Sequence, residues 1–195
     1  EEEMLANFIR SDDIESFKNY ISRTNLPLDS KVFKSNQYNF IENSLISYSA
    51  SFGSVNIFKY LYNHLDTFPT NILSAAVIGG NYEIIHLIES KNIKPNDSVL
   101  SFTISRYKND LFDYFTSNYP IKLGFSAVES SIISQNYYVL HQIFEKNQEF
   151  LTNINYINRM FSIACSNDIR TLFNILYLIP DLDVNISLEI SKSFF

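Results

Sequence analysis

The sequence contains few residues of the kinds that end or redirect secondary structure. Its 195 residues include only 4 glycines and 5 prolines. A strand-dense fold needs a turn about every 8–12 residues, and glycine and proline are among the residues that form such turns most often. The scarcity of both argues against a strand-dense fold and leaves little room for flexible linkers. We therefore expect a mostly helical chain.

Cysteine, basic residues and long apolar runs are also scarce. The single cysteine, Cys165, excludes an intramolecular disulfide and favours a reducing compartment. No apolar run approaches the ~20 residues of a membrane-spanning helix, and the acidic start EEEMLANFIR is unlike the basic start of a signal peptide. The net charge is −6, and an acidic surface repels phosphate backbones. We expect a soluble, cytoplasmic domain that has no membrane span and does not bind nucleic acid.

What the chain does contain is a helical hairpin in residues 44–65, SLISYSASFGSVNIFKYLYNHL. Its first half is apolar with small residues, and Gly53 then supplies a position where a tight turn is possible. In its second half, Ile57, Phe58 and Leu61 recur at helical spacing. Such a hairpin is too short to bury its own apolar face, so it needs neighbours of the same kind.

Copies of this hairpin recur along the chain. Equivalent turn positions follow one another at spacings of 27, 27, 28 and 33 residues, at Gly53, Gly80, Tyr107, Gln135 and Asp168. An apolar residue stands four, five and eight residues after each turn position, and a polar residue stands six after it. The polar residues are Lys59, His86, Asp113, His141 and Asn174. This pattern predicts one buried apolar stripe and one solvent-exposed polar position per repeat, as in a repeat solenoid.

The repeat resembles the ankyrin repeat. Residues 71–89, NILSAAVIGGNYEIIHLIE, are the copy most similar to the ankyrin motif T-P-L-H-x-A-A-x-x-G-H-x-x-I-V-x-L-L. The chain also resembles the divergent ankyrin-like domain of unknown function found in large protist ankyrin families, over about residues 44–176. It departs from the motif because serine replaces the usual histidine, no copy has the Thr-Pro corner, and the period is below the usual ~33 residues.

The resemblance implies an all-α, ankyrin-like solenoid of stacked helix hairpins with shortened or absent β-hairpin fingers. We expect a single repeat domain over residues 1–195, with an N-terminal helix hairpin at 1–23 and a connector at 24–42. The expected repeats cover residues 43–70, 71–96, 97–123, 124–152 and 153–185. Residues 186–195 would begin a further helix, which indicates either a fragment of a longer array, the interpretation that we favour, or a capping helix.

No group of residues has the spacing of a catalytic or metal site. His86 and His141 share a repeat position but lie two repeats apart, too far for joint ligation at about 10 Å per repeat. His64 stands at an expected helix end, where a cation suits the dipole. Cys165 lies among small residues of a helix, and no suitably spaced histidine accompanies it. We therefore expect no enzyme activity, metal, cofactor or small-molecule ligand.

In ankyrin proteins the two residues before the turn glycine line the binding groove together with the loop tips. Carried over, the resemblance implies a partner-binding groove at Ser51, Phe52, Ile78, Gly79, Ser105, Arg106, Ile133, Ser134, Ser166 and Asn167. Phe52, Ile78 and Ile133 are apolar where ankyrin repeats are often polar. Either the short loops bury these three side chains, which is the interpretation that we favour, or the side chains form an apolar strip for a protein partner.

Two functions are compatible with these expectations. The first is a noncatalytic scaffold that binds another protein along the concave face of the solenoid, where stacked hairpins supply a rigid surface. The second is a structural or docking segment of a larger multidomain protein whose activity lies outside this chain. The sequence does not identify the partner.

Overall fold

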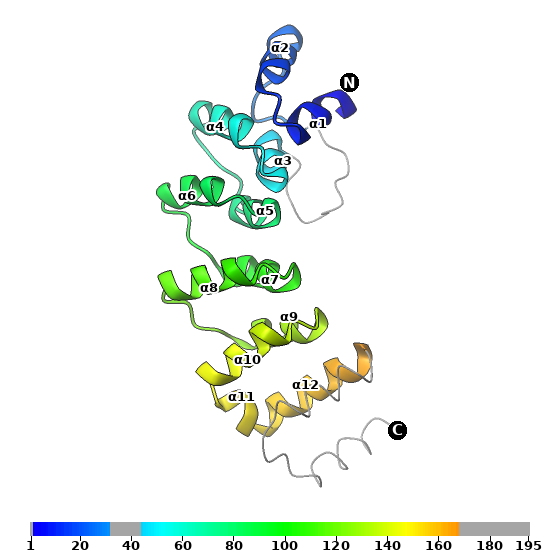
Figure 1. Cartoon of the computed structure of the whole chain (residues 1–195), viewed down its shortest axis with the longest axis vertical. Coiled ribbons are helices and arrows are strands. Elements are labelled where there is room, and N and C mark those ends of the chain that lie inside the picture. The colour runs from blue at the N-terminus through cyan, green and yellow to red at the C-terminus, as the bar shows by residue number, and fades with distance from the viewer. Residues whose placement is uncertain (1, 32–43, 168–195) are drawn as a thin grey trace. The chain divides into compact units, whose positions relative to one another are not determined.

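The computed structural model describes residues 2–31 and 44–167, and within these ranges the chain is built of helices (Figure 1). In chain order the helices are α1 (Glu2–Arg10), α2 (Ile14–Thr24), α3 (Leu45–Phe52), α4 (Val55–His64), α5 (Ile72–Gly79), α6 (Tyr82–Ser90), α7 (Asp97–Ser105), α8 (Asn109–Asn118), α9 (Phe125–Ile133), α10 (Tyr137–Lys146), α11 (Glu149–Thr152) and α12 (Ile154–Asn167). The only β pairing among these residues is an isolated antiparallel bridge between Lys31 and Ser44. The prediction of an all-α fold is confirmed.

The chain divides into two compact units, Glu1–Phe102 and Thr103–Phe195, with the boundary inside α7. In the first unit α1–α2, α3–α4 and α5–α6 pack as hairpins (Figure 1). The helices α1, α3 and α5 pack in one row, and α2, α4 and α6 pack in a second. In the second unit α10 packs against α8 and α9, and α12 packs against α9. This sequential packing of neighbours is that of a helical-repeat solenoid.

The turn inside each hairpin contains one residue with left-handed backbone. The φ angles are 69° at Gly53, 66° at Gly80, 54° at Tyr107 and 57° at Gln135. These are four of the five turn positions that the sequence repeat equates, and the fifth, Asp168, lies outside the described residues. Asp12, in the turn of the first hairpin, also has a positive φ of 53°. The predicted turn register is therefore confirmed for the four repeats that can be compared.

The predicted apolar stripe is buried in the same four repeats. Its members are Ile57, Phe58, Leu61, Ile84, Ile85, Ile88, Leu111, Phe112, Phe115, Val139, Leu140 and Ile143, and each has at most 1% of its surface exposed. The polar residue that stands six after each turn is exposed at His86 and His141 and half-buried at Lys59 and Asp113. The helical period thus places one face of each even-numbered helix in the core.

The connections between successive repeats are short. They comprise residues 65–71, 91–96 and 119–124, none of which belongs to a strand. Such lengths leave no room for full β-hairpin fingers. The predictions for residues 32–42 of the connector, for residues 168–185 of the last repeat and for the further helix at 186–195 lie outside the described residues. The prediction that one domain spans 1–195 stays a prediction.

Adjacent hairpins are joined through their turns. The Asp12 carboxylate accepts hydrogen bonds from the Asn56 and Ile57 backbone N–H groups, both at 3.0 Å, and so caps α4 from the preceding hairpin. Ser54, the N-cap residue of α4, instead donates its hydroxyl to the Ile9 carbonyl at 2.5 Å. In the second unit Asn136 donates to the Ile104 carbonyl at 3.0 Å. Ser54 and Asn136 both directly follow their turn residues, so the junction recurs with the repeat.

No helix in the described ranges has the length and apolar character that crossing a lipid bilayer requires; the longest, α12, has 14 residues.

Candidate functional site

The predicted groove residues lie at the C-terminal ends of the odd-numbered helices and of α12. Ser51 and Phe52 end α3, and Ile78 and Gly79 end α5. In the second unit the corresponding pairs are Ser105 with Arg106, Ile133 with Ser134, and Ser166 with Asn167. Each of the first four pairs therefore immediately precedes its hairpin turn, and the residue after Asn167 lies outside the described residues. Whether these residues bind a partner stays a prediction.

Two of the three apolar groove residues are exposed. Phe52 has 44% and Ile133 has 53% of its surface exposed, whereas Ile78 is half-buried. The expectation that the short loops bury Phe52 and Ile133 is wrong. Each stands at the last residue of its helix, past the buried positions of that helix, and the tight turn that follows does not fold back over it.

Gly79 has a visible packing role. A Cβ atom at this position would lie 2.1 Å from the Ala50 carbonyl oxygen and 2.8 Å from the Gly53 nitrogen. Glycine thus allows the end of α5 to approach the end of α3 more closely than any other residue would. Ser51 is buried, and its hydroxyl donates to the Tyr48 carbonyl at 2.9 Å.

In the first unit, Phe52 belongs to a cluster with Arg10 and Tyr48, here called the Arg10 cluster. The Tyr48 and Phe52 ring centroids lie 4.7 Å apart, and the Arg10 guanidinium carbon lies 5.8 Å and 5.6 Å from them. Both distances permit cation–π attraction. Arg10 also donates through Nε to the Tyr48 hydroxyl at 2.9 Å and through Nη1 to Glu3 Oε1 at 2.8 Å.

The Arg10 cluster carries a fixed positive charge. The hydrogen bond to the Glu3 carboxylate raises the pKa of Arg10 above its already high ordinary value. Burial raises the pKa of Tyr48, because desolvation disfavours a phenolate, while the hydrogen bond from Arg10 acts in the opposite direction. At neutral pH the cluster is therefore a guanidinium beside two rings, one of them exposed. The exposed Phe52 ring suits contact with an apolar surface, and the guanidinium, although paired with Glu3, keeps 41% of its side chain exposed for a further carboxylate.

In the second unit, Tyr107 is bonded to Ser134, which directly follows Ile133 in the chain, and these three residues are here called the Tyr107 patch. Tyr107 has 57% of its surface exposed, and its hydroxyl donates to the Ser134 carbonyl. The sequence pattern had assigned Tyr107 only to a turn. An aromatic residue at a position that is glycine in two other repeats was the available signal.

Sequence reasoning also missed Arg10 and Tyr48. No spacing rule connects these residues, because they lie 38 positions apart on different hairpins.

The predicted groove residues at the end of α12 are bonded within their own helix. The Ser166 hydroxyl donates to the Ser162 carbonyl, and the Asn167 side-chain amide donates to the Ile163 carbonyl.

The histidines each have a local partner. The Nδ1 atom of His86 lies 3.0 Å from Glu89 Oε2, and that of His141 lies 3.6 Å from Glu145 Oε1. His64 ends α4, and its Nδ1 lies 2.7 Å from the Tyr60 carbonyl oxygen. In the part of the chain that the structure describes, no three His, Cys, Asp or Glu residues gather as metal ligands would. The expectation for the Cys165 side chain lies outside the described residues.

Comparison with known protein families gives a match in the middle of the chain. Residues 62–138 match a domain of unknown function, DUF3447. The matched segment runs from the end of α4 to the start of α10 and contains α5 to α9 in full. No curated protein matches the chain, and no solved structure matches it. Over these residues the chain is therefore similar to a domain of unknown function.

Proposed function

We propose that this chain is a noncatalytic, ankyrin-like scaffold that binds another protein through the residues at the ends of its odd-numbered helices. The observation that carries the proposal is the exposure of Phe52 and Ile133, each within two residues of an equivalent turn. Fully burying a large apolar side chain gains about 1.5–3 kcal/mol, and these two half-exposed side chains forgo roughly half of that. Phe52 stands one residue before its turn and Ile133 two before its own, so exposed apolar side chains at the same end of two hairpins are more consistent with a contact surface than with chance.

The ankyrin-like part of the proposal has two supports. Hairpins with a left-handed turn residue recur at spacings of 27 and 28 residues, and the inner helix ends carry small residues such as Ala50 and Gly79. The matched domain of unknown function is known in ankyrin-repeat contexts. The missing Thr-Pro corner and the short connections would make it a divergent member of that group.

The composition of the two surfaces indicates the kind of partner. The Arg10 cluster offers an arginine and aromatic rings, and the Tyr107 patch offers a tyrosine and an isoleucine. Arginine and aromatic residues are enriched at the energetically important centres of protein interfaces. We propose a protein partner that presents apolar side chains next to carboxylates.

The test compares the proteins captured by the parent chain with those captured by Phe52→Ala, Arg106→Ala and Ile133→Ala variants. We expect at least one partner that binds the parent to bind two of the three variants about fivefold or more weakly, because truncating a central anchor costs more than about 1 kcal/mol. Tyr82→Ala is the matched control, since Tyr82 is 40% exposed but begins an even-numbered helix.

The circular-dichroism spectrum and melting temperature of each variant show whether it is folded. If Phe52→Ala and Arg106→Ala both retain every interaction of the parent, the groove assignment is wrong. If Tyr82→Ala loses the same partner, the binding surface lies on the even-numbered helices instead.

A further inference from the structure

The first hairpin leaves open a face that later hairpins bury. Met4 and Phe8 stand eight and four residues before the turn residue Asp12, on α1. Met4 has 51% of its surface exposed and Phe8 is half-buried. The equivalent residues of the next two hairpins have no surface exposed at all, and they are Leu45, Ser49, Ile72 and Ala76.

The second helix of the hairpin repeats the contrast. Ser16 and Tyr20 stand four and eight residues after Asp12, on α2, and both are half-buried. The equivalent residues of the next two hairpins are Ile57, Leu61, Ile84 and Ile88, each with at most 1% exposed. Each of these two later hairpins has a preceding hairpin packed against it, whereas among the described residues none packs ahead of the first.

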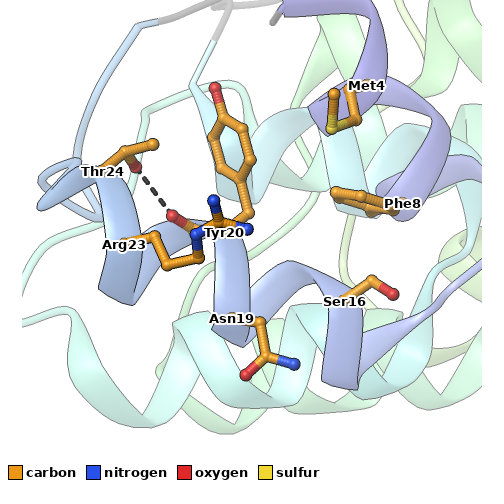
Figure 2. Close-up of a pocket in the computed structure, with 7 residues that line it drawn as sticks. All are labelled: Met4, Phe8, Ser16, Asn19, Tyr20, Arg23 and Thr24. Atoms are coloured by element: carbon orange, nitrogen blue, oxygen red, sulfur yellow. Dashed lines mark hydrogen bonds between the residues drawn. The ribbon is translucent and has the colours of Figure 1, made fainter.

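The four residues of the first hairpin, Met4, Phe8, Ser16 and Tyr20, line one cavity, shown in Figure 2. Its volume is about 440 Å³, and its other lining residues are Asn19, Arg23 and Thr24. Met4 and Phe8 come from α1, and the Tyr20 ring comes from α2, with its centroid 6.3 Å from that of Phe8. Met4, Phe8 and Tyr20 thus line an open cavity, although the equivalent residues of the next two hairpins are buried in the core.

The contacts between the hairpins of the first unit define how such a face is covered. Tyr60, seven residues after its turn, packs edge-on against Phe17, five residues after the turn of the preceding hairpin, with centroids 6.1 Å apart. Lys59, six residues after its turn, forms an ion pair of 2.5 Å with Glu83, three residues after the next turn. In the first hairpin, Asn19 stands seven residues after the turn residue Asp12, which is the position of Tyr60 in its own hairpin. Glu15 stands three residues after Asp12, which is the position of Glu83.

We propose that this open face binds a further helical hairpin of the same repeat type, stacked ahead of α1 in the register of the hairpins that follow. The face continues an interface that the chain already uses between its first and second and between its second and third hairpins. The incoming hairpin places an apolar residue, five positions after its turn, against Asn19 and Tyr20. It places a cation six positions after its turn opposite Glu15, whose side chain is 79% exposed and lies 3.7 Å from Lys18 Nζ in a surface ion pair.

The test adds one repeat of this chain to its own N-terminus. Residues 44–70, joined directly to Glu3, place 27 residues between the added turn and Asp12, which is the spacing of Gly53 and Gly80. Both the extended and the unextended chain carry Ser11→Gly, because Ser11 is the equivalent of Gly79, where α5 approaches α3 most closely. We expect the extended chain to melt at a temperature at least about 5 °C higher and the added amides to be protected from hydrogen exchange.

Two substitutions separate stacking from a nonspecific effect. Met4→Glu lies on the exposed face, so we expect it to change the unextended chain little and to abolish most of the gain in the extended one. We expect Glu15→Lys to reduce the rise in melting temperature, because it places a lysine opposite Lys59 of the added repeat. Lys59→Glu in the added repeat should restore the rise, because the ion pair then forms with its charges exchanged.

An unchanged melting temperature with unprotected added amides would overturn the proposal. So would a gain that Met4→Glu leaves intact. A dimer of the unextended chain that Met4→Glu dissociates would also overturn it, since the face would then belong to a second copy.

Discussion

At the scale of single residues, Gly53, Gly79 and Gly124 have different physical roles. Gly53 has a φ of 69°, a conformation that costs a residue with a Cβ atom about 1–2 kcal/mol. Gly79 lies in a regular helix, and what it provides is space, because a Cβ atom there would overlap the Ala50 carbonyl. Gly124 meets neither condition, since the nearest atom to its added Cβ is Ser126 Oγ at 3.9 Å.

The substitution Gly79→Ala tests the close approach of α5 to α3. We expect it to lower the free energy of unfolding by about 1–3 kcal/mol, the usual cost of forcing extra atoms into a packed contact. Urea denaturation measures the change. Gly124→Ala is the control and should change stability by less than about 1 kcal/mol. Equal effects of the two substitutions would mean that α5 and α3 can separate without loss.

The turn residue Gln135 has a left-handed backbone without being glycine, at φ 57°. We expect Gln135→Gly to raise the free energy of unfolding by about 0.5–1 kcal/mol, because relief of the steric cost exceeds the added entropy of the unfolded chain. Gln148→Gly is the matched control, since Gln148 has a φ of −64° and gains nothing from the exchange. Thermal unfolding of both variants distinguishes them. Destabilisation by Gln135→Gly would contradict the strain that we infer at this turn.

At the scale of helices, two neighbouring aspartates cap two different helices. Asp13 accepts a hydrogen bond from the Ser16 backbone N–H at 3.1 Å and caps its own helix, α2. Asp12 caps α4 of the following hairpin. The same tripeptide, Ser11-Asp12-Asp13, therefore begins one helix and joins it to the next repeat.

The Asp13 cap should make stability depend on pH. The hydrogen bonds from Ser16, its side chain first and its backbone N–H second, lower the pKa of Asp13 below the ordinary 3.8. The folded state therefore binds this proton less tightly than the unfolded state. The stabilisation is present above about pH 4 and is lost as the pH falls through the lower, folded value.

Asp13→Asn tests this pH dependence, because an asparagine oxygen also caps a helix but does not titrate in this range. We expect the difference in unfolding free energy between the parent and the variant to be constant from about pH 5 to 7 and to shift against the parent below about pH 4. Urea denaturation across this pH range measures it, and the other carboxylates cancel in the difference. A difference that does not change with pH would show that Asp13 is not held by these bonds in solution.

At the scale of the whole molecule, contacts are mostly between sequence neighbours. In the first unit each helix packs against its hairpin partner and against the equivalent helix of an adjacent hairpin, and in the second unit α9 packs against α10 and α12, and α10 packs against α8. Stability in such arrays is close to a sum of repeat terms and nearest-neighbour terms. A core defect should therefore be felt most strongly in its own unit.

Phe112→Ala and Phe58→Ala are a matched pair for testing this locality. Both side chains are fully buried at the same repeat position, Phe58 in the first unit and Phe112 in the second. Each substitution should cost about 3–5 kcal/mol. We expect native-state hydrogen exchange to show lost protection mainly in α8 to α10 for Phe112→Ala and mainly in α3 to α6 for Phe58→Ala. Equal loss in both units for either variant would indicate that the chain unfolds as one cooperative body.

The helical repeat could be predicted because its signals are local. Spacings of three to five residues decide which side chains share a helix face, so the stripe at Ile57, Phe58 and Leu61 was predicted before any contact was known. The exposure of Phe52 and Ile133 was not predicted, because it depends on whether a turn folds over the helix end. The Arg10 cluster was missed for a related reason, since its members come from different hairpins.

The sequence alone determined the all-α class, the register of the turns and the buried stripe, because each follows from periodicity within one or two helices. The tertiary structure decided which apolar residues face water. Met4 and Leu45 occupy the same repeat position and are both apolar, yet one is half exposed and the other fully buried. The physical reason is that burial belongs to a pair of surfaces, and only the stacking of hairpins determines whether the second surface is present.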